Sequence, residues 1–207
     1  MKPKAKRQTD PAIAQARREQ ILTAAAECFR RKGYHGAGMA EISKTAGMSA
    51  GHIYNYFESK EAIIESIIEK DMEEMFSIFQ KFEDHPGDVL AALLDGLNIG
   101  VQRHMDTGSC VIDLDMMAEA GRNIKVATLL RETDIQARGR MRQLLTSERS
   151  ALKDIDEREL ESRINVIFSM MAGLLLRKLL YPELTEKTVL IALRPAMKTL
   201  LMPFDKA

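Results

Sequence analysis

The sequence has little of what marks secreted, membrane or redox proteins. Only two of its 207 residues are cysteines, Cys28 and Cys110, and their wide separation fits neither a metal-binding nor a redox motif. Free buried thiols in a reducing compartment are therefore expected rather than a disulfide. No apolar run reaches the length of a membrane span, and the basic N-terminus lacks the apolar core of a signal peptide. We therefore expect a cytoplasmic protein that has no membrane segment, metal site or cofactor.

Strand signals are also nearly absent, and glycine and proline are sparse, with 12 and 6 residues. Most of them fall where helices should begin or end. The expected boundaries are Asp10-Pro11, His85-Pro86-Gly87-Asp88, Thr107-Gly108-Ser109, Gly121-Arg122-Asn123 and Tyr181-Pro182. Between them we expect one helix that ends near Met105 and a shorter one from Val111 to Glu119. The sequence thus predicts an all-α fold of about nine helices.

Charge is balanced over the whole chain but unevenly distributed along it. Residues 1–57 contain ten Lys/Arg and four Asp/Glu, whereas the remaining residues contain twenty and twenty-six. This asymmetry is typical of a basic nucleic-acid module joined to an acidic partner module. Lys2, Lys4, Lys6 and Arg7 form a basic tail, which either adds salt-dependent attraction to phosphates or is a solvated terminus.

The most informative stretch predicts two short helices joined by a tight turn. Gly47 can adopt the left-handed backbone conformation that such a turn needs, and Ser49 is a good N-cap for the second helix. Ile42, Ile53 and Phe57 fall at inward-facing positions. The outward-facing residues of the second helix are small, polar or aromatic, namely Ala50, Gly51, His52, Tyr54, Asn55 and Tyr56. This pattern predicts a helix-turn-helix that enters the major groove of DNA, although the turn alone also fits an ordinary two-helix corner.

Flanking segments sharpen this interpretation. An Ile21-Leu22-Thr23-Ala24-Ala25 helix precedes a Gly33-Tyr34 turn, and Tyr54-Asn55-Tyr56-Phe57 precedes a Lys60-Glu61 pair. Over residues 15–65 the chain resembles the TetR family of transcription regulators. One departure is that Gly38-Met39-Ala40 lacks the hydroxyl residue that usually opens the family's second helix.

The resemblance implies an N-terminal three-helix DNA-binding domain, residues 1–60, and a helical ligand-binding and dimerisation domain, residues 61–207. It places Ala50, Gly51 and His52 at base edges, and Tyr54, Tyr56 and Lys60 at phosphates. The expected DNA-binding residues are Ser49, Ala50, Gly51, His52, Tyr54, Asn55, Tyr56 and Lys60.

The last two helices are rich in apolar residues, which predicts a two-fold four-helix contact between copies. The expected interface residues are Leu160, Ile164, Ile167, Leu174, Leu175, Leu179, Leu193, Met197 and Leu200. A homodimer would present two recognition helices roughly 34–36 Å apart to a near-palindromic operator. The alternative is that these helices cover the core of their own domain.

The middle helices combine methionines and aromatic residues with isolated carboxylates, which suits an adaptable ligand pocket. The expected lining is Met75, Phe76, Phe79, Met105, Asp113, Met116, Met117, Glu119, Phe168 and Met171. Asp113 and Glu119 at the edge of such a pocket would favour a hydrophobic cation. The alternative is an ordinary core stripe with solvated acids.

The sequence therefore favours a dimeric repressor that a small hydrophobic, cationic effector releases from a double-stranded DNA operator, with an efflux gene as the suggested target. Two alternatives belong to other classes. One is a ligand-independent, architectural DNA-binding protein. The other is an enzyme that uses His104, Cys110 and Asp113, which no nucleophile or metal motif supports.

Overall fold

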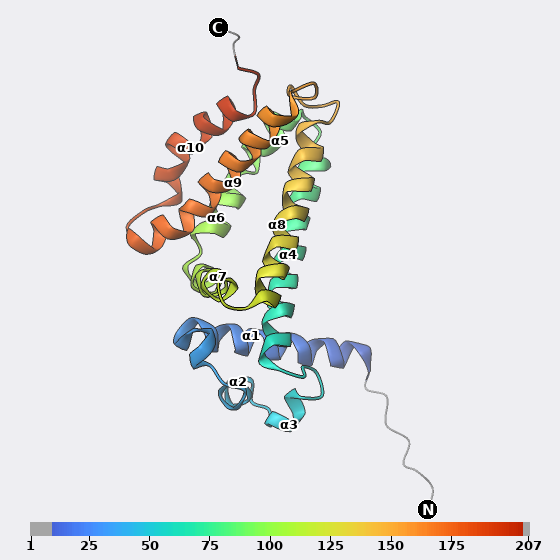
Figure 1. The fold of residues 1–207 in the computed structure, drawn as a ribbon, viewed down its shortest axis with the longest axis vertical. Helices are drawn as coiled ribbons and strands as arrows, with labels where there is room; N and C mark the ends of the chain where they lie inside the picture. Colours follow the sequence, from blue (N-terminus) through green and yellow to red (C-terminus); the bar gives the residue numbers. More distant parts are fainter. Residues whose placement is uncertain (1–9, 205–207) are drawn as a thin grey trace, which may run out of the picture. The chain divides into compact units, whose positions relative to one another are not determined.

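The computed structural model describes residues 10–204, and over that range the chain forms ten α-helices and no strand (Figure 1). The helices are α1 Pro11–Gly36, α2 Met39–Ala46, α3 Ala50–Ile53, α4 Lys60–Glu83, α5 Val89–Asp95, α6 Leu97–Met105, α7 Thr107–Ala120, α8 Ile124–Leu145, α9 Glu157–Leu180 and α10 Glu186–Leu200. The basic tail at Lys2, Lys4, Lys6 and Arg7 lies outside the described residues. In the described part of the chain, no helix is both long and apolar enough to cross a membrane.

The chain divides into two compact units, Met1–Glu69 and Lys70–Ala207. The boundary falls inside α4, beyond the expected division at residue 60. The first turns of α4 carry Ile63, Ile64 and Ile67, which lie in the first unit and are buried. Burial of these side chains explains why the first unit takes the start of a helix that the sequence assigned to the second.

The first unit is built on α1, whose start and end follow directly from its sequence. The Asp10 side chain accepts a hydrogen bond from the Ala12 N–H, and Pro11 occupies the first turn. Gly33 interrupts the helix with a φ of 73°, a conformation that glycine adopts without steric cost. Ile21 and Phe29 of α1 are completely buried, as is Ile42 of α2, the helix that packs against α1.

The second unit has an apolar core to which α4, α5, α6, α8, α9 and α10 contribute. Its fully buried members include Val101 of α6, Leu145 of α8 and Ile164 of α9. In this unit, α6 packs against α9 and α7 packs against α8. In Figure 1, α9 and α10 run side by side.

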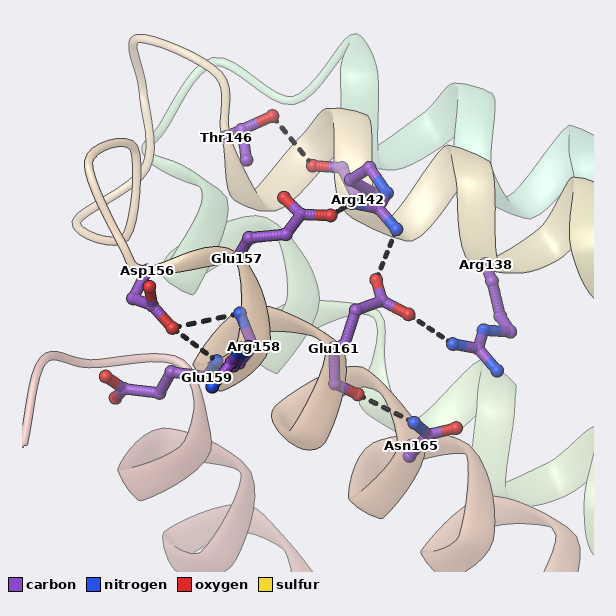
Figure 2. A network of polar contacts seen from close by, with 9 residues as sticks. All are labelled: Arg138, Arg142, Thr146, Asp156, Glu157, Arg158, Glu159, Glu161 and Asn165. Atoms are coloured by element: carbon purple, nitrogen blue, oxygen red, sulfur yellow. Dashed lines mark hydrogen bonds and ion pairs between the residues drawn. The ribbon is translucent and has the colours of Figure 1, made fainter.

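An ion-pair network joins α8 to α9 on the surface of this unit (Figure 2). Glu161 of α9 lies between two guanidinium groups of α8 and accepts hydrogen bonds from both Arg138 and Arg142. Arg142 also pairs with Glu157, one turn earlier on α9. Because all four side chains are partly exposed, the network contributes little to the stability of the fold.

The structure differs from the expected nine helices because the segment from Val89 to Met105 is broken at Gly96. A Cβ atom at Gly96 would lie 2.3 Å from Cε1 of Phe82. The close approach of Phe82 to the backbone therefore requires glycine at this position. The next helix also begins earlier than expected, at Thr107, because the Asp106 carboxylate caps it by accepting hydrogen bonds from the Ser109 N–H and hydroxyl.

Arg163 joins the ends of the last two helices although it is almost fully buried, with 2% of the residue exposed. Its guanidinium donates to the Glu159 carboxylate and to the backbone carbonyls of Leu200 and Met202, and it lies 3.7 Å from the ring centroid of Phe204. A buried charge is tolerated when its donors are satisfied in this way. Arg163 thereby holds the end of α10 against α9.

Candidate DNA-binding and effector sites

Helices α2 and α3 form the helix-turn-helix that the sequence predicts. Gly47 ends α2 in the left-handed region, with φ 65° and ψ 30°, and the Met48 N–H donates to the Ser43 carbonyl. The Ser49 hydroxyl accepts from the His52 N–H at 3.2 Å and caps α3. Ile53 is completely buried, so the opposite face of α3 is the one that can meet a ligand.

The outward-facing residues of α3 are open to solvent. Ala50, Gly51 and His52 are exposed, and a Cβ atom at Gly51 would meet nothing within 4 Å. Tyr54 is 52% exposed, whereas Tyr56 is half-buried, with its ring 5.4 Å from the imidazole of His52. A small, open surface edged by hydroxyl and imidazole donors can approach a duplex closely.

Lys60 has a structural role that the sequence pattern did not indicate. Its half-buried ammonium group donates to the Tyr34 carbonyl at 2.8 Å and lies 4.2 Å from the centroid of the Tyr34 ring. These contacts hold the end of α1 to the start of α4. The phosphate contact expected of Lys60 therefore stays a prediction, and the salt dependence of DNA binding can test it.

At the start of α2, the departure from the family pattern has a visible structural consequence. Gly38 provides no side-chain cap, and the backbone N–H groups of Glu41 and Ile42 donate to the Gly38 carbonyl instead. A hydroxyl that could bind a phosphate at this point is absent, and the exposed Gly38 has open space around its α-carbon.

In the second unit, six of the residues expected to bind ligand lie together. They are Phe79 and Met105, which are buried in the core, and Met75, Phe76, Phe168 and Met171, which pack against it. The structure does not place the others there. Met117 is 56% exposed, and the buried Glu119 carboxylate accepts from Arg122 and Asn123 in the turn between α7 and α8.

Asp113 on α7 is a half-buried carboxyl beside further charges. Burial, followed by the nearby Asp71 carboxylate, raises the pKa of Asp113 to about 6, although Arg103 acts in the opposite direction. Arg103 donates to the Asp71 carbonyl at 3.0 Å and lies 3.3 Å from the Glu74 carboxylate. Asp113 can therefore carry a negative charge only at some electrostatic cost.

The three residues of the enzyme alternative do not form a reactive group. Burial, and then Asp113, raise the pKa of the Cys110 thiol to about 11, and this thiol donates to the His104 carbonyl. Burial also lowers the pKa of His104, whose Nδ1 lies 2.9 Å from the Gly100 carbonyl oxygen. The thiolate that nucleophilic catalysis needs is therefore disfavoured near neutral pH.

The expected dimer residues belong largely to the core of the chain itself. Of the nine, seven are buried, and the other two, Leu179 and Leu200, are half-buried. The buried ones are Leu160, Ile164, Ile167, Leu174, Leu175, Leu193 and Met197. The alternative that these helices cover their own domain accounts for those side chains. A different set on α9 and α10 is exposed, namely Val166, Leu176, Leu180 and Ile191.

Comparison with known proteins agrees with this geometry. Residues 21–67 match the family described as bacterial regulatory proteins, tetR family. The HTH-type transcriptional regulator UidR of Escherichia coli K12 is 34% identical over 124 residues, which are 57% of this chain and 59% of UidR. The N-terminal part of the chain is therefore similar to TetR-family regulators. The aligned part spans about three fifths of the length of this curated relative.

Solved TetR-like structures match nearly the whole chain. Salmonella enterica GusR has a TM-score of 0.71 and 26% identity, with 95% of this chain and 99% of GusR covered. FadR from Bacillus subtilis, solved with stearoyl-CoA, has a TM-score of 0.69 and 19% identity, with 88% and 97% covered. The TetR-like fold therefore extends through both units, beyond the segment that matches the family.

Proposed function

We propose that this chain is a TetR-family transcription regulator that binds a near-palindromic DNA operator as a homodimer and is released by a small-molecule effector. The observation that carries the proposal is the helix-turn-helix, whose exposed α3 face is small and open while its inner face is buried. The basic charge of residues 1–57 supports binding to a polyanion. Such a regulator acts on the chromosome, in keeping with the cytoplasmic location expected from the sequence.

Dimerisation is part of the proposal because one helix-turn-helix reads few base pairs. The exposed apolar residues of α9 and α10 support it, since a face that carries Leu176, Leu180 and Ile191 is costly to leave in water. Gly173 lies on α9 with open space at its α-carbon, which would allow another helix to approach closely.

The effector that we propose is largely apolar and cationic. The clustered methionines and aromatic residues around Phe79 and Met105 supply adaptable apolar contacts, and we assign the charge to Asp113, which lies outside that cluster. Because Glu119 already accepts from two neighbours, the cation preference rests on Asp113. The stearoyl-CoA bound to the similarly folded FadR supports an apolar ligand site, but not the charge. Repression of an efflux gene is the role that such an effector suggests.

Selection of DNA from a randomised duplex library by the full chain tests the core of the proposal. We expect recovery of a near-palindromic sequence, and we expect His52→Ala to change the preferred bases rather than weaken all sequences alike. Lys60→Ala would flatten the dependence of log affinity on log salt by about one unit if Lys60 binds a phosphate. Failure to enrich any sequence would refute specific DNA binding.

The effector is tested separately, on the complex with the selected duplex. Titration with lipophilic cations and with neutral analogues of similar size should release DNA more readily with the cations. Asp113→Asn should remove that difference while the neutral compounds bind as before. Equal release by both series would refute the cation preference. If no small molecule releases DNA, the ligand-independent alternative gains support.

A further inference from the structure

Arg18 connects three parts of the DNA-binding unit. It lies on α1, and one guanidinium nitrogen donates to the Tyr56 carbonyl at 2.9 Å, just beyond the end of α3. Another nitrogen lies 3.5 Å from the Ser66 hydroxyl on α4. The guanidinium also lies over the Phe57 ring, 4.3 Å from its centroid. A single half-buried side chain therefore holds α1, the turn after α3, and α4 together.

The end of α3 needs such a support because the helix is short. It spans only Ala50–Ile53 and continues as a turn in which the Tyr56 and Phe57 N–H groups donate to the Ile53 carbonyl. A single helical turn has little stability of its own, so tertiary contacts decide its position. Inside the unit, Ile53 and Phe57 anchor this segment by burial, and Arg18 supplies a directional contact to its backbone.

The surroundings of Arg18 indicate that it acts on the protein rather than on DNA. It lines an open cavity of about 410 Å³ together with the carboxylates of Glu58, Glu65 and Glu69. Within that lining, Arg18 is the one cationic side chain. Tyr54 and Tyr56 border the same cavity, but the planar guanidinium fork of Arg18 already points at a carbonyl and a hydroxyl of the protein, so these donors are engaged within the unit.

We infer that Arg18 is a positioning residue for operator recognition, which sets the orientation of α3 and of Tyr54 and Tyr56 without contacting DNA. This inference rests on the proposed function, since it concerns how the DNA-reading surface is held. A phosphate-binding arginine would affect both the affinity for any DNA and its salt dependence, whereas a positioning residue affects the preference for the operator. Loss of Arg18 should reduce the preference for the operator, whereas the number of phosphates that the protein neutralises stays the same.

The test measures affinity by fluorescence anisotropy for the duplex selected by the wild-type chain and for a scrambled duplex of equal length and composition, over a range of salt concentrations. Arg18→Gln should lose about tenfold or more in operator affinity, which is the scale of one misplaced base contact in each half-site. Its affinity for scrambled DNA should fall no further than that of Arg17→Gln. Arg17 is exposed on the same helix and undergoes the same change of charge, so it controls for long-range attraction.

Two results would overturn the inference. One is an equal loss of affinity for both duplexes, together with a dependence of log affinity on log salt that is flatter by about one unit. That result would indicate a direct phosphate contact. The other is an operator preference in Arg18→Gln equal to that of Arg17→Gln. A wild-type chain that selects no DNA would instead refute the proposed function, so the two failures are distinguishable.

Arg18→Lys keeps the inference testable if Arg18→Gln loses helicity. Lysine retains the charge, but its ammonium group cannot hold the Tyr56 carbonyl and the Ser66 hydroxyl in one rigid fork. We expect native helicity by circular dichroism, an unchanged salt slope, and a several-fold lower operator preference. Full operator preference in Arg18→Lys would show that charge alone suffices and would also overturn the inference.

Discussion

The role of a charged side chain in this protein depends on its contacts more than on the sequence motif to which it belongs. Lys60 sits at the family's Lys-Glu pair, yet its ammonium group is bound to the Tyr34 carbonyl and ring. Glu119 is expected at a ligand, yet it is buried near the end of α7 and accepts from two donors in the following turn. Asp113 differs from both, because its burial and the adjacent Asp71 carboxylate oppose its charge and no donor to its carboxylate is seen in the described residues. Its ionisation should therefore be measurable in the stability of the protein.

We predict that Asp113→Asn stabilises the protein at high pH. The pKa of Asp113 is raised from 3.8 to about 6 in the folded chain, so the native state binds more protons than the unfolded state between those values. Stability from this group is present at low pH and is lost as pH rises through about 6. At about pH 8 the substitution should raise the free energy of unfolding by at most about 3 kcal/mol, at 1.36 kcal/mol per pKa unit.

Urea denaturation of both proteins from about pH 4 to pH 8 measures this effect. The gain should shrink toward zero at the acidic end of the range. Asp134→Asn, on the exposed face of α8, provides the control for removal of a carboxylate. A stability difference that does not change with pH would contradict a raised pKa for Asp113.

At the scale of the helices, sequence patterns located most elements but not the details that depend on distant contacts. The Asp10 cap and the Gly47 turn were predictable because they are local. The close approach of Phe82 to Gly96 was not, because Phe82 comes from another helix. Similarly, Arg18 lies outside the motif, and its partner Tyr56 is 38 residues away. Apolar periodicity indicated that α9 and α10 each bury one face. It could not show whether that face packs against the same chain or against a second copy.

Arg163 offers a test of how the last two helices are fastened. Arg163→Met should lower the free energy of unfolding by about 2–3 kcal/mol, because the carbonyls of Leu200 and Met202 and the Glu159 carboxylate lose a charged donor. This loss is smaller than the loss expected on breaking a fully buried ion pair, because the Glu159 side chain is 42% exposed. Chemical denaturation measures the change, and the exposed Arg158→Met serves as the matched control. Equal effects of the two substitutions would contradict the anchoring role of Arg163.

At the scale of the whole molecule, the burial pattern separates folding from assembly. Side chains expected at the dimer contact, such as Leu175 at 5% exposure, already serve the core of one chain. The exposed residues Leu180 and Ile191, at 67% and 73%, are free to meet a second copy. In the dimer that we propose, opposite faces of the same helices would serve the core and the partner.

We therefore expect Ile191→Glu and Leu180→Glu to convert the dimer to a monomer that keeps its native helicity, because a charge can remain in water on an exposed face but not inside an apolar contact. Leu175→Glu should instead reduce helicity and lower the free energy of unfolding, since it places an unpaired charge in the core. Analytical ultracentrifugation at micromolar concentration, with circular dichroism on the same samples, distinguishes these outcomes. The monomeric variants should also lose tight operator binding, because each would present a single recognition helix. If Ile191→Glu and Leu180→Glu both remain dimeric, the copies pair through another surface. If Leu175→Glu gives a well-folded monomer, that side chain belongs to the contact between copies after all.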